Sequence, residues 1–341
     1  MNKPKNILVI RLSAMGDVAM VIPVLRVFSQ TYPNVKITVC SRAFFKPLFD
    51  DITNLTFLDA DVYGKHKNFG LLKLAEEALE MGVDSVADLH NVIRSKILSN
   101  YLLLKGLQVR TIDKGRSEKK AFIQTKDLKP LKTSVQRYAE VFGKLGFPLD
   151  MDNHTFPKRK ELTNKLHEII GHTTNKLIGI APFAAHDGKM YPLKMMQEVI
   201  NRLDETGNYR IFLFGGGKKE IAALKSWEPY YKNVINVAGI LNFEEELILI
   251  SNLDLILAMD SGNGHLAAMY GIPVITLWGV THPYAGFMPF NQPKENQLVS
   301  NRDKYPLIPT SIYGNKYPEG YEKSMETIPV ELVVKKVITN L

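Results

Sequence analysis

Short, continuous apolar runs recur along the whole chain and are separated by longer amphipathic stretches. Runs without polar interruption are typical of strands that are buried on both faces of a parallel sheet. The stretches between them repeat their apolar positions at helical spacing. Strands that alternate with helices in this way predict an α/β fold with parallel sheets.

The first half of the chain is predicted to contain one such series. Its strands are expected at 6–12, 35–40, 55–58, 85–88 and 108–112. Its helices are expected at 18–31, 69–81, 93–104 and 135–145. Gly146 and Pro148 follow the last of these helices, and both residues are common just after a helix end.

A second series follows a polar stretch at 147–175. Its strands are expected at 177–181, 209–214, 234–237, 253–258 and 274–277. Its helices are expected at 193–205, 218–226, 243–251 and 264–270. The second half therefore predicts a second parallel sheet covered by helices.

These two series define the expected domains. The first domain is placed at 1–155, the linker at 156–175 and the second domain at 176–325. Residues 326–341 read as a terminal amphipathic helix that could pack back on the first domain. Two doubly wound, Rossmann-like sheets would face a central cleft, because ligands bind outside the carboxyl ends of the strands.

Composition limits the class of protein further. The 341 residues, 45% of them hydrophobic, are enough for two domains that each bury a core. No stretch approaches the roughly 20 apolar residues that span a bilayer, and the first apolar run is too short for a signal peptide. Cys40 is the only cysteine, which excludes an internal disulfide. We expect a cytoplasmic protein.

The charge balance indicates anionic partners. Lys and Arg number 43 against 35 Asp and Glu, a formal net charge of +8. Many of the cations lie in a basic segment at 105–132, and Phe44, Phe45 and Phe49 lie beside basic residues earlier in the chain. This segment is either a solvated face, a contact for acidic groups on a substrate, or a peripheral contact with anionic lipid of the inner leaflet. Nucleic-acid binding is not indicated, because basic residues do not interleave with aromatic ones on one face.

The first strand leads into a turn that carries Gly16 and Asp17 at the start of a helix. Glycine permits close approach of a ligand to the backbone, and a helix N-terminus offers N–H donors to a phosphate. Asp17 has two interpretations here. It is either an N-cap, which aspartate forms well, or a general base that faces the cleft.

The most specific local signal is the stretch Asp260, Ser261, Gly262, Asn263, Gly264 and His265, after a buried strand and at the start of a helix. Small residues leave backbone amides accessible, and the helix dipole favours a diphosphate there. With Ala267 the stretch also matches a dinucleotide fingerprint, but the acidic ribose partner expected at the end of the next strand is missing. A nicotinamide dehydrogenase is therefore disfavoured, and His265 is either a donor to the ligand or a core residue.

Two further turns lie between a strand and a helix. Lys189 lies in one of them and can pair with phosphate oxygens as a point charge. The other contains Gly215, Gly216 and Gly217, followed by Glu220. Because such turns leave the carboxyl ends of strands, they can line one crevice.

These motifs together resemble one known family. They are Gly16-Asp17-Val18, Asp88-Leu89-His90 with Arg94-Ser95, Lys189 before Tyr191-Pro192, Asp260-Ser261-Gly262 with Gly264-His265-Leu266-Ala267-Ala268, and Gly279 with Thr281-His282-Pro283. The chain resembles the ADP-heptose:lipopolysaccharide heptosyltransferases, glycosyltransferase family 9, over about residues 6–290. The resemblance implies a GT-B fold, the donor ADP-L-glycero-D-manno-heptose, and a Kdo or heptose of the lipopolysaccharide inner core as acceptor.

The resemblance also implies roles for individual residues. In the first, acceptor-binding domain, Asp17 would be the general base, with Arg11, Ser13, Gly16, His90 and Arg94 on the acceptor side. In the second, nucleotide-binding domain, the donor would be held by Lys189, Glu220, Asp260, Ser261, Gly262, Gly264 and His265. Tyr191, where tryptophan is common, and Asn263 depart from the family pattern, so a related donor is an alternative.

Transfer with inversion needs a base for the acceptor hydroxyl and a stabilised diphosphate leaving group. The predicted residues supply both without a metal or another cofactor. A metal-dependent, single-sheet transferase is a rival interpretation, because Asp59 and Asp61 form a D-x-D pattern after a strand. A non-catalytic protein that binds a nucleotide sugar or a glycolipid is another.

Overall fold

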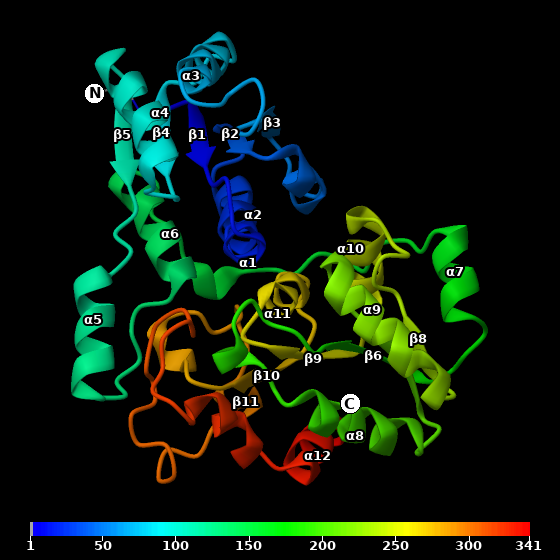
Figure 1. The fold of residues 1–341 in the computed structure, drawn as a ribbon. Helices are drawn as coiled ribbons and strands as arrows, with labels where there is room; N and C mark the ends of the chain where they lie inside the picture. Colours follow the sequence, from blue (N-terminus) through cyan, green and yellow to red (C-terminus); the bar gives the residue numbers. More distant parts are fainter. Residues whose placement is uncertain (1–2) are drawn as a thin grey trace. The chain divides into compact units, whose positions relative to one another are not determined.

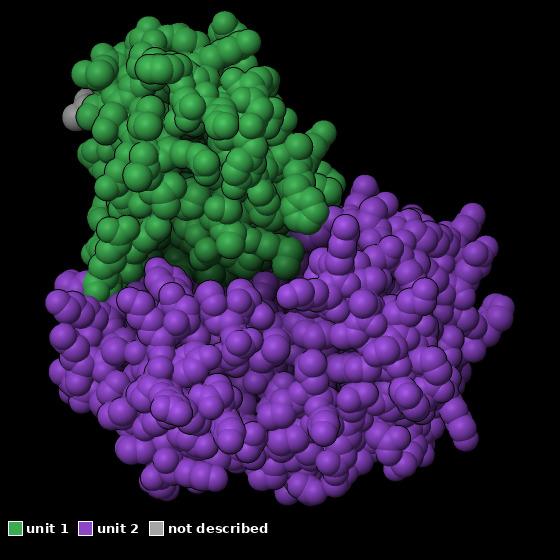
Figure 2. All heavy atoms as spheres, in the orientation of Figure 1, with its two compact units in different colours: residues 1–116, 132–156 green, residues 117–131, 157–341 purple. Residues whose placement is uncertain are grey.

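The computed structural model describes residues 3–341, which divide into two compact units. Unit 1 comprises the chain up to Arg116 together with Lys132–Phe156. Unit 2 comprises Ser117–Leu131 together with Pro157–Leu341 (Figure 2). Each unit contains one parallel sheet, so the predicted α/β fold with two doubly wound domains is confirmed.

The sheet of unit 1 has five strands in the order β3-β2-β1-β4-β5 (Figure 1). Their bounds are β1 Asn6–Ile10, β2 Lys36–Ser41, β3 Leu55–Asp59, β4 Ser85–Asp88 and β5 Gln108–Thr111. Ile7 of β1 pairs with Ile37 of β2 on one side and with Ser85 of β4 on the other. The strand order therefore reverses between β1 and β4, and such a switch point is where doubly wound sheets bind ligands.

Helices cover both faces of this sheet (Figure 1). They are α1 Met15–Ala19, α2 Ile22–Thr31, α3 Gly70–Glu80, α4 Ile93–Leu104 and α6 Ser134–Lys144. Leu8, Ile10 and Val86 of the strands pack with α3 and α4, whereas Phe28 of α2 contacts Phe142 of α6. Because strand side chains alternate between faces, the sheet is the middle layer of three.

One predicted helix, at 18–31, is wrong in its boundaries. The structure has two helices there, α1 and α2, separated at Met20 and Val21. Pro23 lies in the first turn of α2. Proline has no backbone N–H and restricts the residue before it, so it suits a helix start and interrupts a continuous helix.

The sheet of unit 2 has six strands in the order β11-β10-β9-β6-β7-β8. Their bounds are β6 Lys176–Ala181, β7 Tyr209–Leu213, β8 Val234–Asn236, β9 Leu255–Met259, β10 Val274–Trp278 and β11 Gln297–Val299. Ile178 of β6 pairs with Ile211 of β7 and with Leu255 of β9. The switch point of this sheet lies between β6 and β9.

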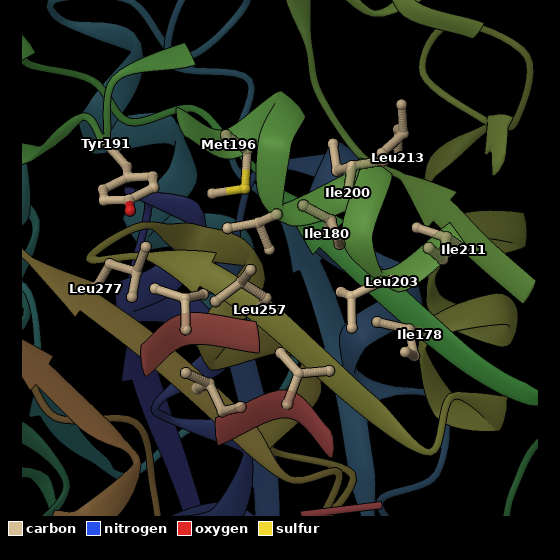
Figure 3. Packing of buried hydrophobic residues seen from close by; sticks show 14 of the residues in the cluster. Ile178, Ile180, Tyr191, Met196, Ile200, Leu203, Ile211, Leu213, Leu257 and Leu277 are labelled. Carbon is tan, nitrogen blue, oxygen red and sulfur yellow. The ribbon is translucent and has the colours of Figure 1, made fainter. Parts of the chain in front are cut away.

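The helices of unit 2 are α5 Arg116–Thr125, α7 Asn164–Ile170, α8 Leu193–Asp204, α9 Gly217–Trp227, α10 Phe243–Asn252, α11 Gly262–Ala268 and α12 Val330–Thr339. One core lies between the strands and α8 (Figure 3). Met196, Ile200 and Leu203 of α8 point toward Ile180 and Leu257 of the sheet in this core (Figure 3). Short 3-10 helices occupy Ala43–Phe49, Met151–Asn153, Asp187–Lys189, Glu228–Tyr230, Pro283–Ala285, Lys294–Asn296 and Tyr321–Thr327.

The two units depart from the expected domain bounds in two segments. Although α5 lies within the range 1–155, its Phe122 is buried and its ring lies 6.2 Å from the ring of His282 in unit 2. The C-terminal helix α12 packs on α8, with Val333 and Val337 in the core of unit 2. Its apolar face completes the core of unit 2.

Within residues 3–341, no helix combines the length and the apolar character that a membrane crossing requires.

Candidate functional site

Polar residues gather where strands end at the two switch points. In unit 1 we define the Asp17 cluster as Arg11, Asp17, His90 and Lys114. In unit 2 we define the Asp260 cluster as Lys189, Asp260 and Thr281. Each cluster is built by side chains that follow neighbouring strands of one sheet.

Arg11 is the centre of the Asp17 cluster. It follows β1 directly and is buried. One terminal nitrogen lies 2.6 Å from Oδ2 of Asp17, and the other donates to the carbonyl oxygen of Leu89 at 2.7 Å. Its guanidinium carbon lies 5.8 Å from the ring centroid of Tyr138. Arg11 therefore connects the end of β1 with the end of β4 and holds the Asp17 carboxylate in place.

Asp17 is the third residue of α1, and Ala14 is the N-cap residue. The interpretation of Asp17 as an N-cap is therefore wrong. Its Oδ2 accepts a long hydrogen bond of 3.4 Å from the backbone N–H of Ala14, in addition to the ion pair with Arg11. Among the described residues its Oδ1 has no hydrogen-bond partner, and the side chain is 31% exposed. One carboxylate oxygen is thus fixed and the other is accessible.

His90 is held at the end of β4 by a buried carboxylate. Oδ1 of Asp88 accepts hydrogen bonds from the backbone N–H groups of His90 and Asn91, at 2.9 and 2.8 Å. Oδ2 of Asp88 accepts from the hydroxyl of Ser95 at 3.0 Å. Nδ1 of His90 accepts a weak bond of 3.4 Å from the backbone of Leu12. The same carboxylate therefore places His90 and the first turn of α4.

The Asp17 cluster has an excess of positive charge. Burial, together with the charges of Arg11 and Lys114, lowers the pKa of His90 to about 3, so that His90 is neutral near pH 7. Burial also lowers the pKa of Lys114, and the nearby Arg11 acts in the same direction. The sequence placed Lys114 only in the basic segment, because nothing in its neighbourhood along the chain distinguishes it. A site with this charge suits an anionic group.

The neutral state of His90 makes the stability of the protein depend on pH. The unfolded histidine, with an ordinary pKa near 6.5, binds a proton that the folded one does not bind above pH 3. The free energy of unfolding should therefore fall as the pH falls from 6.5 toward 3, by up to about 1.4 kcal/mol per pH unit for this residue. We expect His90→Asn to remove most of this contribution in urea unfolding at pH 6.5 and 5.

His172 is exposed and provides the control for this prediction. His172→Asn should leave the pH dependence as it is in the wild type. An equal slope for the wild type and His90→Asn would show that His90 titrates normally in the folded protein.

The other predicted acceptor residues, Ser13, Gly16 and Arg94, do not belong to the Asp17 cluster, and their environments differ. Ser13 is half-buried between β1 and α1. Gly16 lies inside α1 and is not among the glycines with positive φ, so it does not need the left-handed conformation. Arg94 is exposed on α4, and its guanidinium carbon lies 5.1 Å from the ring centroid of Tyr63.

In the Asp260 cluster a lysine pairs with a buried carboxylate. Nζ of Lys189 lies 2.8 Å from Oδ2 of Asp260, and the two side chains are only 15% and 8% exposed. The hydroxyl of Thr281 donates to the same Oδ2 at 2.9 Å. These residues follow β6, β9 and β10, which are adjacent strands. The sequence predicted that the turns of Lys189 and Asp260 line one crevice, and the structure adds their direct ion pair and the contact with Thr281.

The remaining predicted donor residues continue from Asp260 into α11. Ser261 is the N-cap residue, and its hydroxyl is buried without a hydrogen-bond partner among the described residues. Gly262 and Gly264 are helical, and a β-carbon on Gly264 would lie 3.4 Å from a methyl group of Val274. That distance is an ordinary van der Waals contact, so the packing of α11 on β10 does not depend on glycine at this position. His265 is buried on the same helix.

The loop that carries Lys189 depends on a close approach of two glycines. The backbone N–H of Val280 donates to the carbonyl oxygen of Gly188 at 2.8 Å. A β-carbon on Gly279 would lie 2.2 Å from that same oxygen. Gly279 thus permits the contact that sets Lys189 beside Asp260.

We expect Gly279→Ala to lower the free energy of unfolding by roughly 1–3 kcal/mol, the usual cost of overpacking a close contact. Chemical denaturation measures this effect. Gly143→Ala is the control, because a β-carbon there meets no atom within 4 Å and alanine suits its position inside α6, so this variant should not lose stability. An unchanged stability of Gly279→Ala would mean that the two loops can separate without cost.

The side chains of Glu220 and Tyr191 form hydrogen bonds with the backbone of unit 2. Oε2 of Glu220 accepts a hydrogen bond of 2.8 Å from the backbone of Gly216, just before α9. Tyr191 is completely buried, and its hydroxyl donates to the carbonyl oxygen of Ile328 at 2.8 Å. The departure from tryptophan at position 191 therefore concerns the core and the attachment of α12.

Asp59 and Asp61, the rival D-x-D pattern, serve the local backbone. Asp59 accepts from the N–H of Ala43 at 2.9 Å, and Asp61 accepts from those of Gly64 and Lys65 at 2.9 and 3.0 Å. The single-sheet interpretation is wrong, because the chain forms two sheets.

Several cations of the basic segment contact other groups of the protein. Lys105 pairs with Glu76 at 2.9 Å, and Lys132 pairs with Glu140. Nζ of Lys126 donates to the carbonyl oxygen of Pro309 at 2.6 Å. Phe45 and Phe49 are buried, whereas Phe44 is exposed. Of these three phenylalanines only Phe44 is therefore available for a contact at the surface.

Two parallel α/β sheets, each with a polar cluster at its switch point, define a GT-B fold. A glycosyltransferase family 9 structure from Veillonella parvula has a TM-score of 0.76 at 20% identity, over 98% of this chain and 97% of that one. Heptosyltransferase II of E. coli has a TM-score of 0.68 at 20% identity, over 98% of both chains. E. coli heptosyltransferase WaaC, solved with ADP, has a TM-score of 0.68 at 18% identity, over 98% of this chain and 100% of that one.

The chain belongs to glycosyltransferase family 9 (heptosyltransferase), whose family model matches residues 71–311. It is 25% identical over 296 residues to the lipopolysaccharide core heptosyltransferase OpsX of Haemophilus influenzae, which covers 82% of this chain and 80% of that protein. It is 24% identical to lipopolysaccharide heptosyltransferase 1 of Campylobacter coli, over 97% of this chain and 98% of that protein. The family resemblance is confirmed, and the protein is an enzyme, a glycosyltransferase. The dehydrogenase and the non-catalytic binding protein are therefore set aside.

Proposed function

We propose that this protein transfers a heptose-like sugar from an ADP-activated donor to an inner-core acceptor of lipopolysaccharide, with inversion at the anomeric carbon. Relatives whose names identify them as lipopolysaccharide heptosyltransferases support the acceptor class. The similar WaaC structures contain ADP or an ADP-heptose analogue, which supports the donor class. The observation that carries the proposal is the pair of clusters, one with an accessible carboxylate oxygen and one with a buried lysine.

In the proposed reaction Asp17 removes the proton from the acceptor hydroxyl through Oδ1, while Arg11 holds Oδ2. The acceptor oxygen forms a bond to the anomeric carbon as the bond from that carbon to the diphosphate breaks. Ser13, Gly16, His90 and Arg94 are proposed to bind the acceptor sugar, and Lys114 adds positive charge for an acidic group on it. A general base of this kind contributes roughly 10²- to 10⁴-fold to the rate.

The leaving ADP is proposed to be stabilised by groups of unit 2. Lys189 exchanges its contact with Asp260 for the diphosphate oxygens. The amides at the start of α11 and the hydroxyl of Ser261 donate to the same group, together with His265. Glu220 is proposed as the partner of the ribose or adenine. These groups supply positive charge without a metal ion, so transfer should not require one.

Calorimetry and thermal shift with ADP and ADP-heptose, in the presence of EDTA, test this proposal first. We expect both ligands to stabilise the wild type and neither to stabilise the variant with His265→Ala and Lys189→Ala. Transfer to a defined inner-core acceptor, with the anomeric configuration read by NMR, then tests the reaction. Stabilisation by UDP, GDP or CMP derivatives instead would move the donor away from heptose, and activity lost with EDTA would contradict the metal-independent mechanism.

A further inference from the structure

Unit 1 contains a pocket between the start of α4 and the segment before α3. Its volume is about 700 Å³. The lining residues are Asn68, Leu71, Asn91, Val92, Ile93, Arg94, Lys96, Ile97 and Arg116. Only Arg94 among them belongs to the proposed acceptor residues, so most of this pocket has no part in the function described above.

The charged side chains of this pocket are all cationic. Arg94, Lys96 and Arg116 contribute positive charge, and the lining includes no aspartate or glutamate. Along residues 3–341 none of these three side chains forms an ion pair. Uncompensated cations at one site favour an anionic ligand, above all a phosphate or a carboxylate.

The pocket also presents apolar surface to solvent. Ile93 and Ile97 lie one helical turn apart on α4 and are 77% and 42% exposed. Isolated exposed apolar residues are ordinary, but two that line one cavity indicate a binding surface. The ligand that fits both properties is an amphiphile with an anionic group and an apolar chain.

The pocket is connected with the Asp17 cluster through the turn after β4. Asn91 and Val92 follow His90 directly, and Asp88 binds the backbone of both His90 and Asn91. The hydroxyl of Ser95 joins this carboxylate to the first turn of α4, from which Arg94 and Ile97 project. The residues that place His90 thus also place one wall of the pocket.

We propose that this pocket binds the anionic, lipid-bearing end of the glycolipid acceptor, while the reacting sugar lies at the Asp17 cluster. The inference rests on the proposed function, because it assigns a second subsite to the same acceptor. Of the basic segment 105–132 the proposal uses Arg116, which lines the pocket, whereas Lys105, Lys126 and Lys132 contact other groups of the protein. The acceptor lipid, rather than a membrane surface, is the ligand, because the pocket continues the turn that carries His90.

The test compares an acylated inner-core acceptor with its fully deacylated form. Binding of each is measured without donor by thermophoresis, and KM and kcat are measured with donor. The variant carries Ile93→Ser and Ile97→Ser. We expect it to weaken binding and raise KM for the acylated acceptor by roughly tenfold or more, since the variant removes apolar area from the subsite. For the deacylated acceptor, the affinity and KM of this variant should stay within about twofold of the wild-type values, because this acceptor has no chain to contact the two isoleucines. The kcat of the variant should stay within about twofold of wild type for both acceptors.

Leu103 and Leu104 provide a matched control, because they are exposed on the same helix outside the pocket. The variant Leu103→Ser with Leu104→Ser should behave as the wild type with both acceptors. If the leucine variant weakened binding as much as the Ile93 and Ile97 variant does, the assignment would be overturned. It would also be overturned if the Ile93 and Ile97 variant bound the acylated acceptor with wild-type affinity.

A second variant tests the anionic group. Arg94→Gln with Lys96→Gln should weaken binding of both acceptor forms and reduce its dependence on salt, because both forms keep their acidic groups. Lys73→Gln, an exposed position on α3, is the control. Salt dependence equal to that of the wild type would contradict the proposed role of the cations.

Two outcomes separate this inference from the proposed function. If the wild type transfers sugar to both acceptors and the Ile93 and Ile97 variant is unaltered, the subsite is wrong and the proposed function stands. If the wild type neither binds nor modifies either acceptor, the proposed function fails and the subsite with it. Loss of binding to phosphatidylglycerol vesicles without a change in KM would assign the pocket to the membrane and overturn the inference.

Discussion

Asp17→Asn is expected to lower kcat by roughly 10²- to 10⁴-fold, because it removes the proposed general base while it keeps the size of the side chain. Affinity for ADP should be unchanged, since the nucleotide is assigned to unit 2. Steady-state kinetics with saturating donor, together with ADP titration, measure the two quantities. This is the largest effect that the proposed mechanism predicts for a single substitution.

The substitution also breaks the ion pair with Arg11, so a control for structural damage is needed. Unit 1 contains a matched ion pair, in which a terminal nitrogen of Arg26 lies 2.8 Å from Oδ2 of Asp51. The side chains of this pair are 5% and 27% exposed, close to the 7% and 31% of Arg11 and Asp17. Asp51→Asn should cost a similar amount of stability and leave kcat near that of the wild type. If Asp17→Asn retained more than a tenth of the wild-type kcat, Asp17 would be only the partner that positions Arg11.

Lys189→Met is expected to lower the affinity for ADP by roughly 10- to 100-fold, because a charge-assisted contact with the diphosphate is lost. It should also destabilise the free protein by about 3 kcal/mol, since Asp260 is then buried without its cation. Calorimetric titration and chemical denaturation measure these two effects separately.

A double variant separates the two roles of this lysine. Lys189→Met with Asp260→Asn removes both charges of the buried pair and should recover most of the stability, but not the affinity for ADP. Lys165→Met is the control, because Lys165 pairs with Glu245 at 2.7 Å at the surface and should contribute at most about 1 kcal/mol. Recovery of ADP affinity in the double variant would show that Lys189 acts on the donor only through the fold.

Much of the architecture was predictable because it depends on local patterns. The apolar runs that become β1, β6 and β9 are largely buried in their sheets, and the segments that follow them contain Asp17, Lys189 and Asp260. The family assignment also came from such short motifs. The order of the strands in each sheet could not be predicted from local patterns. The positions of the two switch points depend on that order and were therefore not predictable either.

The pairing of distant residues was not predictable in the same way. The sequence placed Lys189 and Asp260 at one crevice but did not predict their direct ion pair, nor the position of Lys114 beside Arg11. Each pair is assembled only when strands far apart in the sequence become neighbours. The basic segment looked like one surface, but several of its cations find carboxylates or carbonyl groups elsewhere in the fold.

The sequence by itself determined the α/β class, the two sheets, the turns that carry the polar residues and the family. The tertiary structure alone decided that α5 and α12 belong to unit 2, that Asp17 has one fixed and one accessible oxygen, and that cations and exposed isoleucines surround one pocket. The physical reason is that the periodicity of apolar residues specifies which face of an element is buried, whereas its partner is selected by packing and charge across the whole chain.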